Sequence, residues 1–222
     1  DGLNDEPQHC FPALLNGSEN FGLIIESIKW AFKHTERNIA ETGLNTLIEL
    51  FNNVSMSPVA TAFHQQYYLG LLQDIFAVVT DTLHSPGFKL QAQILAHMFL
   101  LVESKAITAP LWDTATVQAT DNSTYLRELL SDMFLRSFPN LTPAVVKSTV
   151  NGLFEHCRDL ATFKQHLRDF LVQLKEFGGG DDLFIEEREA EQARKAAEIQ
   201  KRQEAVPGII NPHARPDEMC DT

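Results

Sequence analysis

The stretch ENFGLIIESIKWAFKH (residues 19–34), followed at once by TERNIAETGLNTLIELFNNV (residues 35–54), decides the fold class of this chain. In both segments the apolar residues recur at intervals of three and four, which is the period of an amphipathic α-helix. They are Phe21, Ile24, Ile25, Ile28, Ala31 and Phe32 in the first segment, and Ile39, Leu44, Leu47, Ile48, Phe51 and Val54 in the second. Because almost no loop separates the two runs, they predict two antiparallel helices, the second with Thr35 as a candidate cap.

The same helical period continues along the chain, and sustained strand alternation is nearly absent. Further helices are predicted over residues 59–83, 88–104, 122–138, 142–157 and 160–177. Ser57-Pro58 and Thr142-Pro143 each combine a capping residue with a proline suited to the first helical position, so both are predicted helix starts. Residues 105–121 lose the period and predict a long loop. The helix over 88–104 is apolar around much of its circumference, so we expect it to lie buried between neighbours.

Paired in order, these helices begin near residues 20, 59, 122 and 160, at spacings of about 40, 60 and 40 residues, the second spacing lengthened by the loop. A helical hairpin that recurs every ~40–47 residues is typical of HEAT and armadillo repeats. Such hairpins bury their apolar faces by stacking. The sequence therefore predicts an all-α HEAT-repeat superhelical solenoid of about four antiparallel helix pairs, with residues 1–177 as its repeats. An irregular helical bundle is the alternative.

Composition limits the partners. The chain of 222 residues carries 30 acidic and 18 basic residues, a formal charge of -12, so its surface should repel nucleic acid and anionic membranes. Basic protein surfaces are the expected partners. No signal peptide or transmembrane run supports secretion, so we interpret the four N-x-[ST] sequons, at Asn16, Asn53, Asn122 and Asn140, as chance. Because the chain opens on Asp1-Gly2 without methionine, we expect a fragment of a longer protein.

No motif predicts catalysis, a cofactor or a metal site. Cys10, Cys157 and Cys220 are odd in number and far apart, which predicts reduced thiols in the cytosol or nucleus. The pairs His9-Cys10 and His156-Cys157 lack a second ligand pair at zinc spacing, and HExxH, GxSxG and phosphate-loop motifs are absent. We therefore expect a binding protein and not an enzyme.

The end of the chain differs from the repeats. Gly178, Gly179 and Gly180 predict a hinge, because consecutive glycines make a fixed backbone entropically costly. Residues 181–205 then predict a charged helix, in which 21 helical residues (183–203) would reach roughly 31 Å. Two interpretations remain open: an arm that crosses a concave surface, or a cap on the last repeat. Residues 206–222 predict a flexible acidic tail.

Several strings are more specific than any period. They are IKWAFKHT (28–35), FAVVTDT (76–82), FKQHLRDFLVQLKEF (163–177), DLFIEERE (182–189), VPGIINPH (206–213) and EMCD (218–221). On these strings the chain closely resembles the carboxy-terminal repeats of the chromosome-region-maintenance exportins, which are karyopherin-β nuclear export receptors. The likeness covers nearly the whole chain and departs from the family in the loop 105–121, around residues 53–62 and at the glycine hinge.

The resemblance implies a ring-shaped HEAT receptor that binds RanGTP and leucine-rich export-signal cargo cooperatively and shuttles between nucleus and cytoplasm. It places the cargo groove in earlier repeats, so the three cysteines here have no part in it. Nucleoporins and Ran-binding proteins stay open as further partners. A general HEAT scaffold, such as a phosphatase-type scaffold, and an all-helical enzyme are the competing classes.

The resemblance also implies that the last helix and tail cross the ring in the free receptor and disfavour cargo binding. The residues to which it assigns this regulatory role are Asp182, Leu183, Phe184, Ile185, Glu186, Glu187, Asp217, Glu218 and Asp221. Upstream of the hinge, Leu167, Phe170, Leu171 and Leu174 match a leucine-rich export signal in spacing. We interpret these four as an ordinary helix core face.

Overall fold

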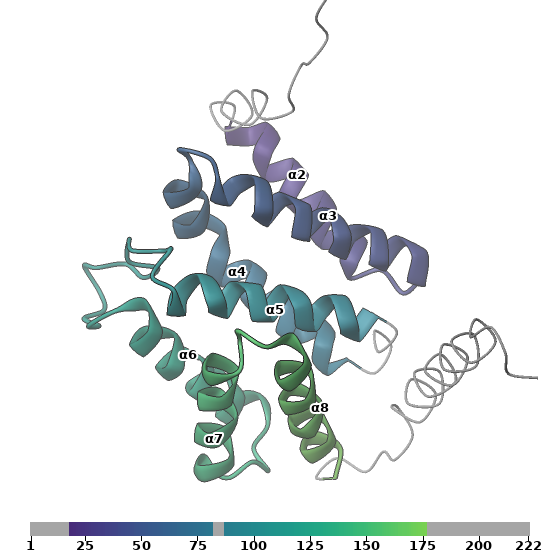
Figure 1. Cartoon of the computed structure of the whole chain (residues 1–222), viewed down its shortest axis with the longest axis vertical. Helices are drawn as coiled ribbons and strands as arrows, with labels where there is room; N and C mark the ends of the chain where they lie inside the picture. Colours follow the sequence, from purple (N-terminus) through teal and green to yellow (C-terminus); the bar gives the residue numbers. More distant parts are fainter. Residues whose placement is uncertain (1–17, 82–86, 177–222) are drawn as a thin grey trace, which may run out of the picture. The chain divides into compact units, whose positions relative to one another are not determined.

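The structure, a computed structural model, describes residues 18–81 and 87–176. These residues form seven α-helices and no strand (Figure 1). The helices are α2 (Ser18–Phe32), α3 (Arg37–Ser55), α4 (Ala60–Thr80), α5 (Phe88–Glu103), α6 (Asn122–Ser137), α7 (Pro143–Glu155) and α8 (Leu160–Glu176). All of them lie in one compact unit. The predicted all-α class and the order of its helices are confirmed.

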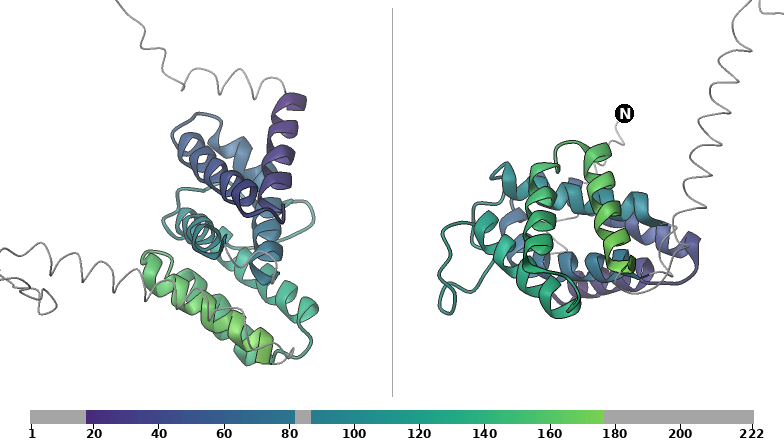
Figure 2. Two further views of the ribbon diagram at one scale, coloured as in Figure 1. Left: turned by 90° about the vertical axis from the view of Figure 1, so that its right-hand side faces the viewer. Right: turned by 90° about the horizontal axis from the view of Figure 1, so that it is seen from below.

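The helices pack as hairpins that follow one another in chain order (Figures 1 and 2). Helix α2 packs along α3, α4 along α5, and α6 along α7, while α7 also packs along α8. Helix α3 touches α5, and α5 touches α7. Three helix pairs are therefore complete, and α8 begins the predicted fourth pair. The separate charged helix predicted over residues 181–205 lies outside the described residues.

Aromatic rings join each helix pair to the next along the series α2, α4, α6 and α8. The ring centroids of Phe21 and Phe63 lie 6.0 Å apart, those of Phe76 and Phe134 5.2 Å apart, and those of Phe134 and Phe170 4.9 Å apart. All five side chains are buried. Aromatic rings at these separations contribute stability beyond that of burying their apolar surface. These ring contacts therefore stabilise the packing of each helix pair on the next.

Helix α5 lies at the centre of the described residues and contacts α3, α4, α6, α7 and α8. Its Phe99 is fully buried, with ring centroids 4.8 Å from Phe154 of α7, 6.1 Å from Phe163 of α8 and 6.3 Å from Phe76 of α4. The prediction that this helix is buried between neighbours is confirmed. One side chain thus joins four helices.

The predicted helix starts had mixed outcomes. At α7, Thr142 caps the helix by accepting a hydrogen bond from the backbone N–H of Val145 at 3.3 Å, and Pro143 takes the first turn, as predicted. At α4 the prediction was wrong, because the helix begins at Ala60 and the Ser57 hydroxyl instead accepts from the N–H of Val59 within a turn. Thr35 is likewise not the cap of α3, whose N-cap position is Glu36 with no side-chain cap bond.

Candidate protein-interaction site

The residues predicted to regulate binding all lie outside the described residues. This holds for the hinge Gly178–Gly180, for the six positions 182–187, and for Asp217, Glu218 and Asp221. Their roles stay predictions. What the structure describes is the framework that precedes them: the junctions that hold the repeats, and the side chains that remain at the surface.

Helix α8, the last described helix before the hinge, is held firmly in the stack. Phe163, Leu167, Phe170 and Leu171 are at most 4% exposed, and the helix packs on α5 and α7. The interpretation of the leucine-rich spacing as a core face is therefore confirmed for Leu167, Phe170 and Leu171, which are buried in the fold and inaccessible to a receptor. The chain that follows is therefore attached to a helix whose position in the stack is fixed.

The junction of α5, α6 and α7 is organised by Arg127. Its Nη1 donates to Asn151 Oδ1 on α7 at 2.8 Å, and its Nη2 lies 3.5 Å from Glu103 Oε1 on α5. The guanidinium carbon lies 4.1 Å from the ring centroid of Phe154, a cation–π distance. The planar guanidinium satisfies several partners at once, which a lysine ammonium does not do in the same geometry. The sequence did not predict this junction, because Glu103, Asn151 and Phe154 each lie 24 or more residues from Arg127 along the chain.

The buried side-chain amide of Asn122, at the start of α6, anchors the loop 105–121 to the repeats. Its Nδ2 donates to the carbonyl oxygens of Ile107 and Ala109, both at 3.0 Å, and its Oδ1 accepts from the N–H of Leu111 at 3.0 Å. Three hydrogen bonds from this one side chain thus help to hold the predicted loop, which also accepts a hydrogen bond from Gln65 Nε2 at the carbonyl oxygen of Pro110, at 3.3 Å. The same burial makes the Asn122 sequon inaccessible to glycosylation in the folded chain, in agreement with its interpretation as chance.

Replacing Asn122 with alanine should therefore release the loop. Three backbone groups would lose their partner, and a buried polar group left without one costs ~1–3 kcal/mol. We expect the free energy of unfolding, measured by urea titration, to fall by about 2 kcal/mol, because water can reach part of the loop. Asn53→Ala, at an exposed sequon on α3, is the matched control and should be neutral. Equal effects of the two substitutions would contradict the assigned anchor.

Two histidines from different helices flank Phe51. The ring of His64 on α4 lies 6.5 Å from that of Phe51, and the ring of His97 on α5 lies 5.9 Å from it. The Nε2 atom of each histidine is buried without a hydrogen-bond partner. Burial lowers the pKa of both imidazoles below 6.5, and the nearby His97 lowers that of His64 further. Both rings are therefore neutral in the folded chain at pH 7.

This arrangement predicts that the chain loses stability in mild acid. The unfolded chain binds protons on both histidines near pH 6.5, whereas the folded chain resists doing so, so stability falls as the pH drops below about 6.5. The melting temperature should decrease more between pH 7.5 and 5.5 in the wild-type chain than in His64→Gln/His97→Gln. Asn53→Ala, at an exposed position of α3, changes no titratable group and is the control, so it should keep the wild-type slope. An identical slope in the double variant would refute this assignment.

Among the described residues, Cys157 and His166 are the other potentially reactive side chains, and both contact backbone carbonyl groups of the fold. The Cys157 thiol is buried, its Sγ lies 3.0 Å from the carbonyl oxygen of Phe154, and burial raises its pKa, which favours the protonated form. His166 Nε2 lies 2.8 Å from the carbonyl oxygen of Thr149, and its ring faces His156 at 5.4 Å. Within residues 18–81 and 87–176, no three His, Cys, Asp or Glu side chains are grouped to hold a metal ion.

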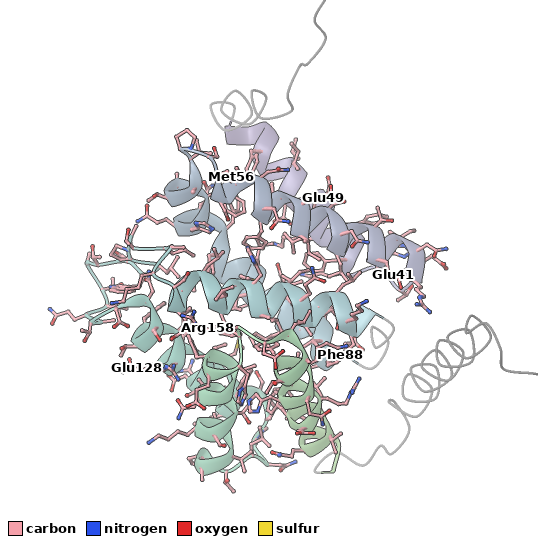
Figure 3. The ribbon with its side chains drawn as sticks, in the orientation of Figure 1. Glu41, Glu49, Met56, Phe88, Glu128 and Arg158 are labelled. Atoms are coloured by element: carbon pink, nitrogen blue, oxygen red, sulfur yellow. The ribbon has the colours of Figure 1, made fainter. Side chains whose placement is uncertain are left out.

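The surface carries charge and scattered apolar groups. Figure 3 shows Glu41 and Glu49 along α3 and Met56 in the turn that follows, where it is 81% exposed. Lys29 of α2 and Lys33, the residue after that helix, pair with Asp74 of α4 at 3.1 and 2.5 Å, which joins the first two helix pairs. No described helix is both long and apolar enough to cross a lipid bilayer.

Stacked antiparallel helix pairs of this kind define the class: a helical-repeat protein of the HEAT type. Comparison with known proteins then identifies the group within that class. The family model described as CRM1 C terminal matches residues 3–179, so the chain belongs to the CRM1 carboxy-terminal family.

Curated relatives extend this result. The chain is 48% identical over 210 residues to Exportin-1 of Schizosaccharomyces pombe, 46% over 218 residues to Protein EXPORTIN 1A of Arabidopsis thaliana, and 42% over 217 residues to Exportin-1 of Drosophila melanogaster. These alignments cover 92–96% of this chain and 19–20% of the relatives. The chain thus spans about a fifth of the length of the relatives it matches.

Proposed function

We propose that this chain is the carboxy-terminal part of a nuclear export receptor. The observation that carries the proposal is the 42–48% identity to Exportin-1 proteins over more than nine-tenths of the chain. The receptor acts by binding and not by catalysis. Its export-signal cargo and RanGTP bind the whole receptor, which shuttles through the nuclear pore between nucleus and cytoplasm.

In this proposal the repeats up to residue 177 are mainly architecture that closes the receptor. Three side chains support that role. Arg127 joins three helices and Phe99 joins four, while Asn122 fixes the loop 105–121 to α6. The acidic balance of the chain suits basic partner surfaces and disfavours direct contact with nucleic acid.

We further propose that residues 181–205, with the tail 206–222, form an autoinhibitory arm. Two features support it: the triple-glycine hinge, and α8, whose buried face gives the arm a fixed starting point. Such an arm would have two docking positions, each belonging to a different state of the receptor. If RanGTP and cargo bind one state more tightly than the other, the position of the arm changes the affinity for cargo. Asp182, Glu186 and Glu187 at its start, and Asp217, Glu218 and Asp221 in the tail, supply the charge for such docking.

The test is a deletion after Gly180 in the full-length receptor. Without the arm, we expect cargo affinity measured in the absence of RanGTP to rise by ~5–150-fold, the usual range of allosteric coupling. Deletion after Ala205 removes the tail alone, so it separates the effect of the tail on cargo affinity from the effect of the helix. RanGTP binding by both variants shows that the receptor is folded. An unchanged cargo affinity after deletion at Gly180 would reject the arm as a regulator.

A separate experiment tests the receptor assignment itself. The full-length receptor should retain RanGTP and an export-signal peptide together, each strengthening the binding of the other. A general helical-repeat scaffold would share the repeat period but would not retain RanGTP. If the wild-type receptor does not retain RanGTP, the result would therefore favour the scaffold class.

A further inference from the structure

Two histidines lie where the first helix pair, α2–α3, packs on the second pair, α4–α5, a contact that we call the first junction. The rings of His64 on α4 and His97 on α5 lie 6.5 and 5.9 Å from that of Phe51 on α3, which is 1% exposed. The Nε2 atom of each histidine is buried and has no hydrogen-bond partner. A proton added to either ring in this packing would bury a charge without a partner, which is costly.

None of the charged residues of α3, α4 and α5 is placed as a counter-ion for such a proton. Burial lowers the pKa of both imidazoles below 6.5, and the charge of His97 lowers that of His64 further. The hydroxyl of Tyr68, whose ring lies 6.3 Å from that of His64, donates to the carbonyl oxygen of Met98 at 2.8 Å. The charged side chains of the three helices are paired elsewhere or exposed: Arg37 pairs with Glu41, Asp74 with Lys29 and Lys33, and Glu103 with Arg127, while Glu49 and Lys89 are exposed.

The packing of α4–α5 on α6, α7 and α8, which we call the second junction, is different. There the Arg127 guanidinium donates to Asn151 and pairs with Glu103, so its charge is compensated. Between α7 and α8, the Nε2 atom of His166 lies 2.8 Å from the carbonyl oxygen of Thr149, and an imidazolium would also donate this bond. Protonation of histidine therefore opposes the packing of the first junction and not that of the second.

We propose that the first junction is a pH-dependent switch, at which the α2–α3 pair moves away from α4–α5 in mild acid while the second junction stays closed. Opening lets water reach both imidazoles, so protons bind the open junction more readily than the closed one and shift the equilibrium towards it. Helix pairs in a stack contact only their neighbours, so one junction can open without unfolding the rest. The α2–α3 pair moves as a unit, because its helices cross closely at Gly43. The proposal assigns the acid sensitivity predicted above to one junction, and it does not depend on the export function.

Native-state hydrogen exchange on the complete 222-residue chain tests the switch, at pH 7.5 and 5.5 and at low urea concentrations. Dividing the exchange rate of each amide by that of an unstructured chain at the same pH gives an equilibrium constant for opening. Because an accessible histidine titrates near pH 6.5, each histidine should favour opening about tenfold more at the lower pH, and the two together up to ~100-fold. The opening constant of amides in α3 should rise by this factor. It should also depend less on urea than that of amides in α7, because a local opening exposes less surface than global unfolding.

Two variants make the test specific. His64→Gln/His97→Gln removes both titrating groups, so the opening constant of α3 should lose its dependence on pH. Asp74→Asn is the matched control, because it weakens the same junction by removing the carboxylate that pairs with Lys29 and Lys33, without changing a histidine. It should raise the opening constant of α3 at both pH values and keep the wild-type ratio between them.

Three results would overturn the proposal. The first is that amides of α2 and α3 open with the same constant and the same urea dependence as those of α7 at both pH values, since the chain would then unfold as one unit. The second is a wild-type pH dependence in His64→Gln/His97→Gln. The third needs no variant: in an NMR titration of the wild-type chain, either histidine gains its proton at pH 6.5 or above while α3 stays protected from exchange, since the closed junction would then accept the charge.

Discussion

Replacing Phe99 with alanine is expected to lower the free energy of unfolding by ~3–5 kcal/mol, the range for truncating a buried phenylalanine. The ring is fully buried on α5 and contacts the rings of Phe76, Phe154 and Phe163 on three other helices. None of these helices can close the cavity without breaking its contacts with a neighbour, because α5 lies between them. Urea unfolding of the 222-residue chain measures the effect.

Phe99→Leu is the control for this substitution. It keeps most of the apolar volume, so its cost should stay below about 1.5 kcal/mol. A similar loss in both variants would mean that the ring contacts, and not the filled volume, supply the stability. A loss below about 1 kcal/mol in Phe99→Ala would contradict the central position of this side chain.

Replacing Gly43 with alanine should cost about 3 kcal/mol, at the upper end of the usual range for overpacking. Gly43 lies in α3 where that helix crosses α2. An added Cβ would lie 2.6 Å from the backbone nitrogen of Phe32 and 2.8 Å from the Cβ of Ala31. A backbone atom of a packed helix cannot rotate away as a side chain can, so α2 and α3 must separate.

Gly70→Ala provides a matched control, because Gly70 is also in mid-helix but an added Cβ would meet no atom within 4 Å beyond the backbone of its own helix. There the substitution should raise stability by ~0.5–1 kcal/mol, since alanine favours the helix over glycine. Thermal melts of both variants, followed by circular dichroism, test the pair of expectations. Opposite signs support the close crossing of α2 and α3, and two stabilised variants would refute it.

The helices and their order were predictable because the information is local. Apolar residues at intervals of three and four are enough to define an amphipathic helix, and the seven helices predicted between residues 19 and 177 lie within a few residues of their observed bounds. Starts of helices were less predictable. Ser57 has the composition of a cap, yet its hydroxyl bonds within the turn before α4, because the turn and not the residue type decides which N–H it faces.

Polar side chains at the junctions could not be assigned from the sequence. Asn122 was singled out only as a sequon, whereas it anchors a loop through groups 11–15 residues away. His64 and His97 carry no signal in the sequence, since nothing local brings residues 33 positions apart to one phenylalanine. The hinge and regulatory residues remain predictions, because they lie beyond the described helices.

The sequence alone determined the all-helical class, the succession of helix pairs, the long loop and the family. These depend on backbone hydrogen bonds and apolar periodicity within single segments. The tertiary structure alone decided which side chains are buried without partners and which glycine permits a close crossing. Those properties depend on how helices far apart in the sequence pack against one another, and packing between segments has no local period from which it can be predicted.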